Sequence, residues 1–260
     1  MEILLTGRAA VITGASKGLG FAMAQEFARS GANVAMLARR ADVLEAARAE
    51  VANGARGKVI GIQADVSRAE DCARAFAAAE AAFGQVDILV NNAGTSRAVP
   101  FETITDAMWQ EDLDLKLFAA IRLCRLALPG MKSRRWGRVI NVLNIGAKAP
   151  RANGAPTAVS RAAGMALTKI LANEGAAHNV LVNAMLVGQI VSDQWVRRHA
   201  SAGSNEPFET FAAKLGEKIP LGRLGKAEEF AAMACLLCSE RGGFTTGAAI
   251  NMDGGASPVV

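Results

Sequence analysis

The sequence predicts an α/β protein with a parallel sheet covered by helices on both faces. Short apolar runs rich in β-branched residues alternate with Ala-rich stretches along the whole chain, as expected when each strand is followed by a crossover helix. The runs are almost continuously apolar, which is typical of strands buried on both faces. With 260 residues and 51% hydrophobic content, the chain can fill one large core or two small ones, and no linker divides it.

Seven runs are the expected strands. The stretches between them have helical composition, except for residues 189–220, which look irregular and are long enough for a lid or substrate loop. The strand-like runs are AAVITG (9–14), NVAMLA (33–38), KVIGIQADV (58–66), VDILVNNAG (86–94), GRVINVL (137–143), NVLVNAML (179–186) and AAINMDGG (248–255).

Composition argues against several classes of protein. The net charge is +5, but the basic residues are scattered and aromatics make up only 5%, so we expect no nucleic-acid partner. Cys235 and Cys238 form a C-x-x-C pair inside an apolar helical run without a second ligand pair, so we expect packed helix residues and no metal site. No apolar run reaches the roughly 18 residues of a membrane span, and we expect a soluble, cytoplasmic protein.

The first strand leads into a glycine-rich turn with Gly14, Gly18 and Gly20 in the sequence TGASKGLG. Glycines at such a turn allow close approach of the backbone to phosphate, and the following helix N-terminus supplies N–H donors. The spacing is G-x-x-x-G-x-G instead of the commoner dinucleotide fingerprint. An ordinary loop is the alternative interpretation of this turn alone.

Four motifs occur in order: TGASKGLG, ADV (64–66), NNAG (91–94) and MDGG (252–255). From Gly7 to Gly255 the chain therefore resembles a short-chain dehydrogenase/reductase. The resemblance implies a single Rossmann domain over residues 1–260, a seven-stranded doubly wound sheet, a small-molecule substrate and commonly a homotetramer or homodimer. The candidate cofactor-binding residues are Gly14, Ser16, Lys17, Gly18, Leu19, Gly20, Arg39, Asp65, Val66, Asn91, Ala93, Gly94, Arg161, Gly188, Ile190 and Ser192.

The end of the second strand favours NADP(H) over NAD(H). Enzymes that prefer NAD usually carry an acidic residue there to bind the ribose 2′-OH. This chain has Ala38 followed by Arg39, and Ser16 and Lys17 lie in the glycine-rich turn. These groups could neutralise a 2′-phosphate. Alternatively, Arg39 and Arg40 are solvated loop charges.

The catalytic positions that the resemblance implies are all substituted. Thr157 stands at the position of the family tyrosine, Arg161 at its lysine, Asn144 at its serine and Lys116 at its asparagine, and the chain contains no tyrosine. A threonine hydroxyl is a much weaker acid than a phenol, and Arg161 cannot relay a proton because its pKa is too high. Binding groups therefore remain while the usual proton donor is lost.

Three functions stay open on this sequence: an NADP(H)-dependent oxidoreductase with another proton source, a nucleotide-binding or regulatory protein without turnover, and a non-redox, lyase-type enzyme. Lys116 is the candidate proton donor, because repulsion by Arg161 would lower its pKa toward about 8. Alternatively, Lys116 points outward or is neutralised by Asp112 or Asp114.

The segment after the sixth strand could contact an anionic or aromatic substrate. If it does not, it is a solvated helix face with Trp195 packed inward. Its candidate residues are Trp195, Arg197, Arg198 and His199.

Overall fold

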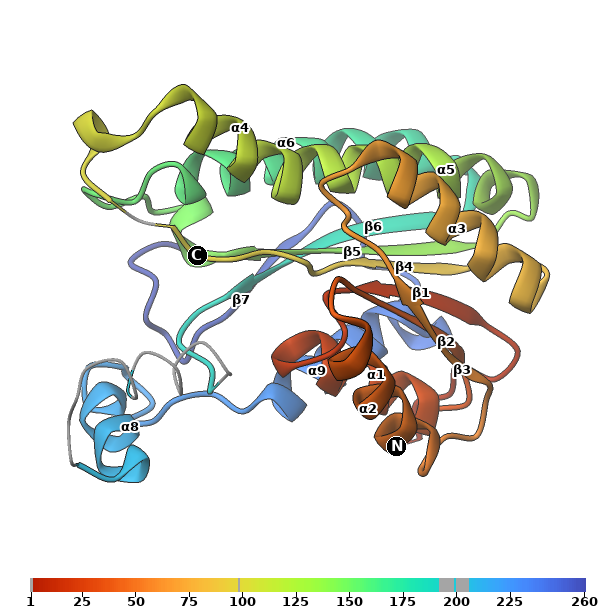
Figure 1. Ribbon diagram of the computed structural model, residues 1–260, viewed down its shortest axis with the longest axis horizontal. Coiled ribbons are helices and arrows are strands. Elements are labelled where there is room, and N and C mark those ends of the chain that lie inside the picture. The colour runs from red at the N-terminus through yellow and green to blue at the C-terminus, as the bar shows by residue number, and fades with distance from the viewer. Residues whose placement is uncertain (1, 98, 192–198, 200–205) are drawn as a thin grey trace.

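Seven strands form one parallel sheet in the computed structural model, which describes residues 2–97, 99–191, 199 and 206–260 (Figure 1). The spatial order is β3-β2-β1-β4-β5-β6-β7, which confirms the seven-stranded, doubly wound sheet that the resemblance implied. The strands are β1 (Ala9–Thr13), β2 (Asn33–Ala38), β3 (Val59–Gln63), β4 (Ile88–Asn91), β5 (Gly137–Asn144), β6 (Val180–Val187) and β7 (Ala249–Met252).

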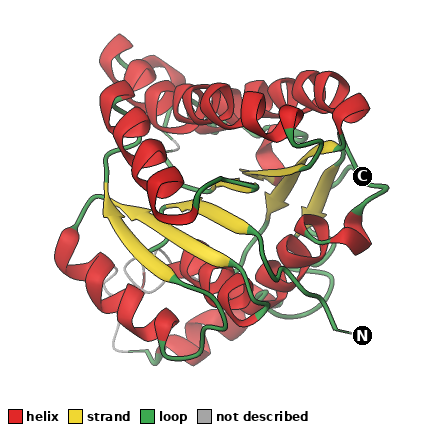
Figure 2. Cartoon of the chain, turned by 90° about the vertical axis from the view of Figure 1, so that its right-hand side faces the viewer, coloured by secondary structure: helices red, strands yellow, loops and turns green. Residues whose placement is uncertain are grey.

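Helices cover both faces of this sheet. One face carries α1, α2 and α9, and the other carries α3, α4, α5 and α6; Figure 2 shows the sheet between the two layers. The helices are α1 (Gly18–Arg29), α2 (Ala41–Ala52), α3 (Ala69–Phe83), α4 (Asp106–Leu113), α5 (Ala119–Ser133), α6 (Thr157–Gly175), α8 (Phe208–Gly216) and α9 (Ala227–Cys238), with a π turn η2 (Asp114–Phe118) between α4 and α5 and 3-10 turns η1 (Phe101–Thr103), η3 (Ile145–Ala147), η4 (Ala176–His178) and η5 (Glu240–Gly242).

The strand order changes direction at β1. This strand pairs with β2 on one side and with β4 on the other, so that Val11 lies beside both Ala35 and Leu89. The chain therefore leaves β1 and β4 toward opposite faces of the sheet, which opens a crevice at their carboxyl ends. That crevice is where a ligand is expected in this architecture.

Burial explains why the apolar runs became strands. Every residue of β1 is buried, including its polar Thr13, and β5 and β6 are buried up to their last residue. Two main clusters of buried apolar side chains fill the two faces, one under α1 and α9 and the other under α3 and α5. The sheet thus needs helices on both sides, as the continuous apolar pattern indicated.

Two smaller predictions can now be compared with the structure. Cys235 and Cys238 are buried free thiols in α9, which confirms that they are packed helix residues. The described part of residues 189–220 is less irregular than predicted, because it contains α8. In the described part of the chain no helix combines the length and apolarity needed to span a bilayer.

Candidate active site

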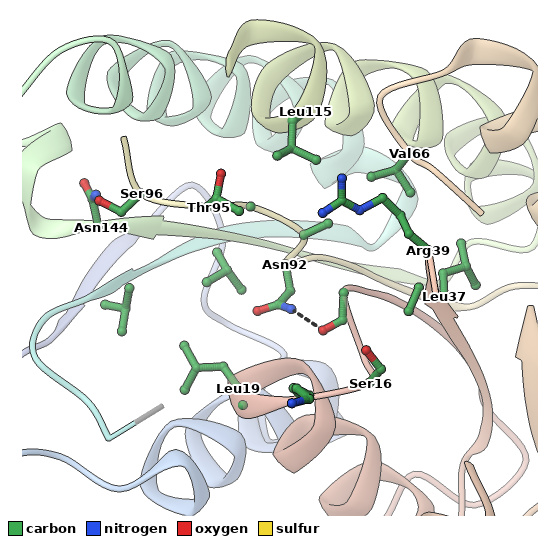
Figure 3. Close-up of a pocket in the computed structure, with 18 of the residues that line it drawn as sticks. Ser16, Leu19, Leu37, Arg39, Val66, Asn92, Thr95, Ser96, Leu115 and Asn144 are labelled. Carbon is green, nitrogen blue, oxygen red and sulfur yellow. Dashed lines mark hydrogen bonds between the residues drawn. The ribbon is translucent and has the colours of Figure 1, made fainter. Parts of the chain in front are cut away.

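A cavity of about 830 Å³ opens at the carboxyl ends of the strands, where the strand order reverses (Figure 3). Arg39 lies at one end of it, and Asn144 and Ser96 lie at the other. Its lining residues include Gly14, Ser16, Lys17, Gly18, Leu19, Leu37, Arg39, Arg40, Asp65, Val66, Asn92, Ala93, Gly94, Thr95, Ser96, Leu115, Asn144, Thr157, Arg161 and Gly188.

The glycine-rich turn is shaped by close backbone contact with the end of β4. Gly14 has a φ of +64°, and a Cβ there would lie 3.0 Å from the Cα of Ala93. The Asn92 amide Nδ2 donates hydrogen bonds to the carbonyls of Thr13 at 2.8 Å and Gly14 at 3.2 Å; Figure 3 draws one hydrogen bond from Asn92 as a dashed line. A Cβ on Gly20 would collide with the Gly14 carbonyl. Larger residues would therefore displace α1 from the strand.

The N-terminus of α1 faces this cavity and fits a phosphate. Its N-cap residue is Lys17, whose side chain has no acceptor for the first backbone N–H groups, and such groups at a helix N-terminus bind anions. Lys17, Arg39, Arg40 and Arg161 line the cavity, against one acidic residue, Asp65. The wall therefore favours a ligand with several negative charges.

At the inner wall, a buried ion pair lies behind Thr157. Lys116 is on the π turn η2, and its Nζ donates hydrogen bonds to Asp112 Oδ1 and, at 2.8 Å, to Thr157 Oγ1. The other oxygen of Asp112 accepts a hydrogen bond of 2.6 Å from Ser160 Oγ. The Lys116 side chain is 0% exposed and that of Asp112 is 4% exposed. This cation is thus buried, with Asp112 and Thr157 as its hydrogen-bond partners.

Burial lowers the pKa of Lys116 to about 8, from a usual value of 10.5, although Asp112 opposes the change. The direction agrees with our prediction, but the cause does not: desolvation dominates, and repulsion by Arg161 is a smaller contribution. The alternative that Lys116 points outward is wrong, because its side chain is fully buried. Asp112 is its carboxylate partner, whereas Asp114 pairs with Arg122 at 2.9 Å.

The Thr157 hydroxyl forms hydrogen bonds that connect α6 to the loop after β4. Its Oγ1 accepts hydrogen bonds from the Arg97 backbone N–H at 3.0 Å and from Lys116, and donates one of 2.7 Å to the Arg97 carbonyl. A hydroxyl has one proton and two acceptor lone pairs, so these three bonds use its full capacity. For Thr157 to contact a substrate oxygen, its hydrogen bond to the Arg97 carbonyl must first break.

Arg161 and Asn144 keep unused hydrogen-bonding capacity. Arg161 Nη1 donates to the Val142 carbonyl at 2.7 Å, and burial lowers the pKa of this guanidinium to about 10, so it stays charged at neutral pH. Arg161 Nε and Asn144 Oδ1 are buried and have no hydrogen-bond partner among the described residues. A Cβ on Gly94 would collide with Arg161 Nη2. Because Gly94 has no side chain, the Arg161 guanidinium can lie against its backbone.

Most of the predicted site residues meet in this cavity. The lining includes Gly14, Ser16, Lys17, Gly18, Leu19, Arg39, Asp65, Val66, Ala93, Gly94, Asn144, Thr157, Arg161 and Gly188. Gly20, Asn91, Lys116 and Ile190 do not line it: Gly20 packs against Gly14, the Asn91 amide donates to Asn141, Lys116 lies behind Thr157, and Ile190 is buried beside Gly225. Ser192, Trp195, Arg197 and Arg198 lie outside the described residues.

His199 contacts the backbone carbonyl of Glu206 and packs against the rings of Phe208 and Phe211. The structure therefore shows it in contact with its own segment, and its predicted contact with substrate stays a prediction.

Sequence reasoning did not assign several of the lining residues to the site, among them Thr95, Ser96 and Leu115. The first two directly follow NNAG, and that adjacency could have identified them. It named Asp112 only as a possible neutralising group for Lys116. The spacing of four residues between Asp112 and Lys116, which places them on one helix face, was the available signal.

The fold and this cavity define a dinucleotide-binding protein of the doubly wound α/β class. The model of the family described as enoyl-(acyl carrier protein) reductase matches residues 14–257. The chain also aligns at 32% identity over 255 residues with the 3-oxoacyl-(acyl-carrier-protein) reductase of Aquifex aeolicus, covering 98% of this chain and 99% of that relative. The chain therefore belongs to the short-chain dehydrogenase/reductase family.

Other relatives act on different substrates. The chain is 35% identical over 254 residues to 3β-hydroxysteroid dehydrogenase 1 of Eggerthella lenta, covering 96% of this chain and 94% of that one. Among solved structures it superposes on L-sorbose reductase from Gluconobacter frateurii, complexed with NADPH and L-sorbose, with a TM-score of 0.95, 32% identity and 100% coverage of both chains. Overall similarity therefore does not single out one substrate.

Proposed function

We propose that the protein is an NADP(H)-dependent oxidoreductase that interconverts a carbonyl and an alcohol on a small molecule. The observation that carries this proposal is the cavity of about 830 Å³, which runs from a glycine-rich turn and basic side chains to a polar end around Asn144. The NADPH-bound L-sorbose reductase of nearly the same fold supports it. When bound, the nicotinamide would supply or accept a hydride at the substrate carbon.

Preference for NADP(H) over NAD(H) rests on the cationic end of the cavity. Arg39 follows β2 at the position where an acidic residue would bind the ribose 2′-OH, and Arg40 and Lys17 line the same cavity. Each charge-assisted hydrogen bond to a 2′-phosphate would contribute roughly 1.5–3 kcal/mol. Ser16 in the glycine-rich turn would add an uncharged donor.

The polar residues at the inner end would hold the reacting groups. Arg161, whose Nε–H has no partner among the described residues, would bind the nicotinamide ribose, while the amide nitrogen of Asn144 would donate a hydrogen bond to the substrate oxygen. Lys116 would supply the proton through Thr157. As negative charge grows on the substrate oxygen, Thr157 would give up its proton and receive one from Lys116, so that no threonine alkoxide accumulates.

A second candidate, nucleotide binding without turnover, has one observation in its favour. Thr157 Oγ1 already makes three hydrogen bonds, two of them to the backbone of Arg97. If this arrangement persisted in the bound state, the site would have no group to transfer a proton to the substrate. Binding and turnover must therefore be measured separately.

The test is a cofactor titration followed by a substrate screen. We expect tight NADPH binding and measurable NADPH oxidation with at least one of L-sorbose, acetoacetyl-CoA or the reactive diketone butane-2,3-dione. The Lys116→Met variant should bind NADPH equally well and lose turnover. NADPH binding without oxidation by any carbonyl would favour the second candidate, whereas absence of binding would contradict both.

We also propose that the protein is a homo-oligomer. Helix α6 exposes an apolar stripe of Val159, Ala162, Ala166 and Ile170, whose spacing of three or four residues places them on one side of the helix. Val159 and Ile170 are 52% and 55% exposed. A second copy packing against this stripe would cover it, and dimers and tetramers both remain compatible with this contact.

A further inference from the structure

A second cavity, of about 540 Å³, adjoins the nucleotide cavity. The two share Arg39, Asp65, Thr95 and Leu115 in their walls. The rest of the second cavity is formed largely by α4 and the π turn, and it is acidic. Its other lining residues are Ser67, Arg97, Ala107, Gln110, Glu111, Asp112 and Asp114.

The acidic side chains of this second cavity have different partners. Glu111 pairs with Arg97 at 3.1 Å and Asp114 with Arg122 at 2.9 Å, and all four of these side chains are partly exposed. Asp112 instead pairs with Lys116, which has no exposed side-chain surface. Asp112 therefore pairs with the buried Lys116 and also lines the second cavity.

We propose that Asp112 is a relay and positioning residue that exchanges protons between water in the second cavity and Lys116, on the side of the lysine remote from the substrate. This inference rests on the proposed function, since it gives Lys116 a route by which its proton is replaced. Its geometric basis is one continuous set of contacts: second cavity, Asp112, Lys116, Thr157, nucleotide cavity.

The transfer balances in both directions. During reduction the substrate oxygen takes the Thr157 proton, Thr157 takes one from Lys116, and Lys116 becomes a neutral amine. Asp112 then takes a proton from hydronium or a buffer acid in the second cavity and passes it to Lys116, which restores the ion pair. Oxidation runs through the same steps in reverse. Burial makes the neutral amine accessible near neutral pH, because it disfavours the ammonium form.

The groups that face this pair decide its charge. Arg161 and the hydroxyls of Thr157 and Ser160 face it from α6, Arg97 from the loop after β4, and Glu111 and Asp114 lie on its own helical segment. Both arginines disfavour the charged lysine, and Asp112 is the anion that opposes them. Removing the charge of Asp112 should therefore lower the pKa of Lys116 further.

The first experiment compares Asp112→Asn with Asp114→Asn. Both changes remove one carboxylate charge from the second cavity, but only the first touches Lys116. With NADPH and butane-2,3-dione, we expect Asp112→Asn to lower kcat about tenfold or more and to raise the solvent deuterium isotope effect on kcat. Formate should restore part of the rate of Asp112→Ala and leave Asp114→Ala unchanged. Equal rates and isotope effects for the two Asn variants would overturn the proposal.

The second experiment does not depend on turnover. The pH dependence of the free energy of unfolding in urea reports the titration of Lys116. The difference between the unmodified protein and Lys116→Met gives the contribution of Lys116 to that dependence. In Asp112→Asn the alkaline rise in stability should begin about one pH unit or more below that of the unmodified protein. In Asp114→Asn it should not move. An unmoved onset in Asp112→Asn would contradict the proposed coupling.

Ser160→Ala provides a milder test in case Asp112→Asn does not fold. It removes the hydrogen bonds that Ser160 Oγ donates to Asp112 Oδ2 and, at 3.1 Å, to the Thr157 carbonyl, while the Asp112 charge is kept. It should change kcat roughly twofold to tenfold, with a shifted pH profile. An unchanged rate and profile would count against the relay. If Lys116→Met kept full turnover, the proposed proton donor itself would be wrong, and that result is distinct from failure of Asp112 alone.

Discussion

At the residue scale, the predicted replacement of the family tyrosine by Thr157 would change the site through reach as well as acidity. The shorter side chain ends beside the backbone of Arg97, with which it exchanges two hydrogen bonds. The sequence predicts that Arg161, which remains charged, stands at the family lysine position, and in the proposed function Lys116 supplies the proton that a tyrosine would carry. The proposed function therefore assigns binding and proton supply to different side chains.

Arg39 should determine cofactor preference. Because its guanidinium can form charge-assisted hydrogen bonds to a 2′-phosphate, Arg39→Ala should narrow the ratio of NADPH to NADH affinity about tenfold or more. Arg48→Ala is the control, since Arg48 lies on α2, pairs with Glu45 and does not line the cavity. Fluorescence titrations with both cofactors measure the ratio. Equal affinities in the unmodified protein would refute the preference.

Thr157→Val should test how much the hydrogen bonds of the Thr157 hydroxyl, which connect α6 to the loop after β4, contribute to stability. Valine keeps the shape but leaves the N–H and carbonyl of Arg97 and one hydrogen bond of Lys116 unpaired, which should cost about 1–3 kcal/mol in the free energy of unfolding. Thr157→Ser keeps the hydroxyl and should cost less, about 1 kcal/mol for a lost methyl group. Urea unfolding compares them. A valine variant as stable as the serine variant would show that these hydrogen bonds contribute little to the free energy of unfolding.

At the element scale, the strands could be predicted from the sequence, whereas the burial of Lys116 on the π turn η2 could not. The strands were predictable, because burial on both faces leaves continuous apolar runs; VDILVNNAG, for example, contains β4 (Ile88–Asn91). The burial of Lys116 was not, since EDLDLK reads as a charged, solvated helix. Only the path of α4 through a π turn into α5, against α6, turns Asp112 and Lys116 inward.

The buried lysine should make stability depend on pH. The pKa of Lys116 is about 8 in the folded protein and 10.5 without burial, so between these values the unfolded chain binds more protons. Below about pH 8 the lysine is charged in both states and the cost of burying it is fully present. The free energy of unfolding should therefore rise by roughly 3 kcal/mol between about pH 8 and about pH 10.5 on account of Lys116.

Urea unfolding at successive pH values measures this contribution as the difference between the unmodified protein and Lys116→Met. The methionine variant has no titrating group at this position and should lack the rise. Parallel curves for the two proteins would show that Lys116 keeps its ordinary pKa.

At the scale of the whole molecule, the cavities and the exposed apolar side chains lie on different parts of the fold. Both cavities gather around the carboxyl ends of the strands, at the reversal of strand order. The apolar stripe of α6 lies on the helix surface away from the sheet, since the buried positions Gly164, Thr168 and Ala172 occupy the opposite side. Self-association through this stripe would therefore leave access to the cofactor cavity open.

Ile170→Glu should weaken that association. A charge in the middle of an apolar contact between two copies would be buried without a partner, which is costly, so the variant should have a smaller mass in sedimentation or light scattering than the unmodified protein. Ala46→Glu adds the same charge to an exposed position of α2 and should leave the mass unchanged. Because Ile170 lies outside both cavities, NADPH affinity should be retained. An unmodified protein that runs at the 27.0 kDa of a single chain would contradict the oligomer, and equal masses for all three proteins above that value would place the interface elsewhere.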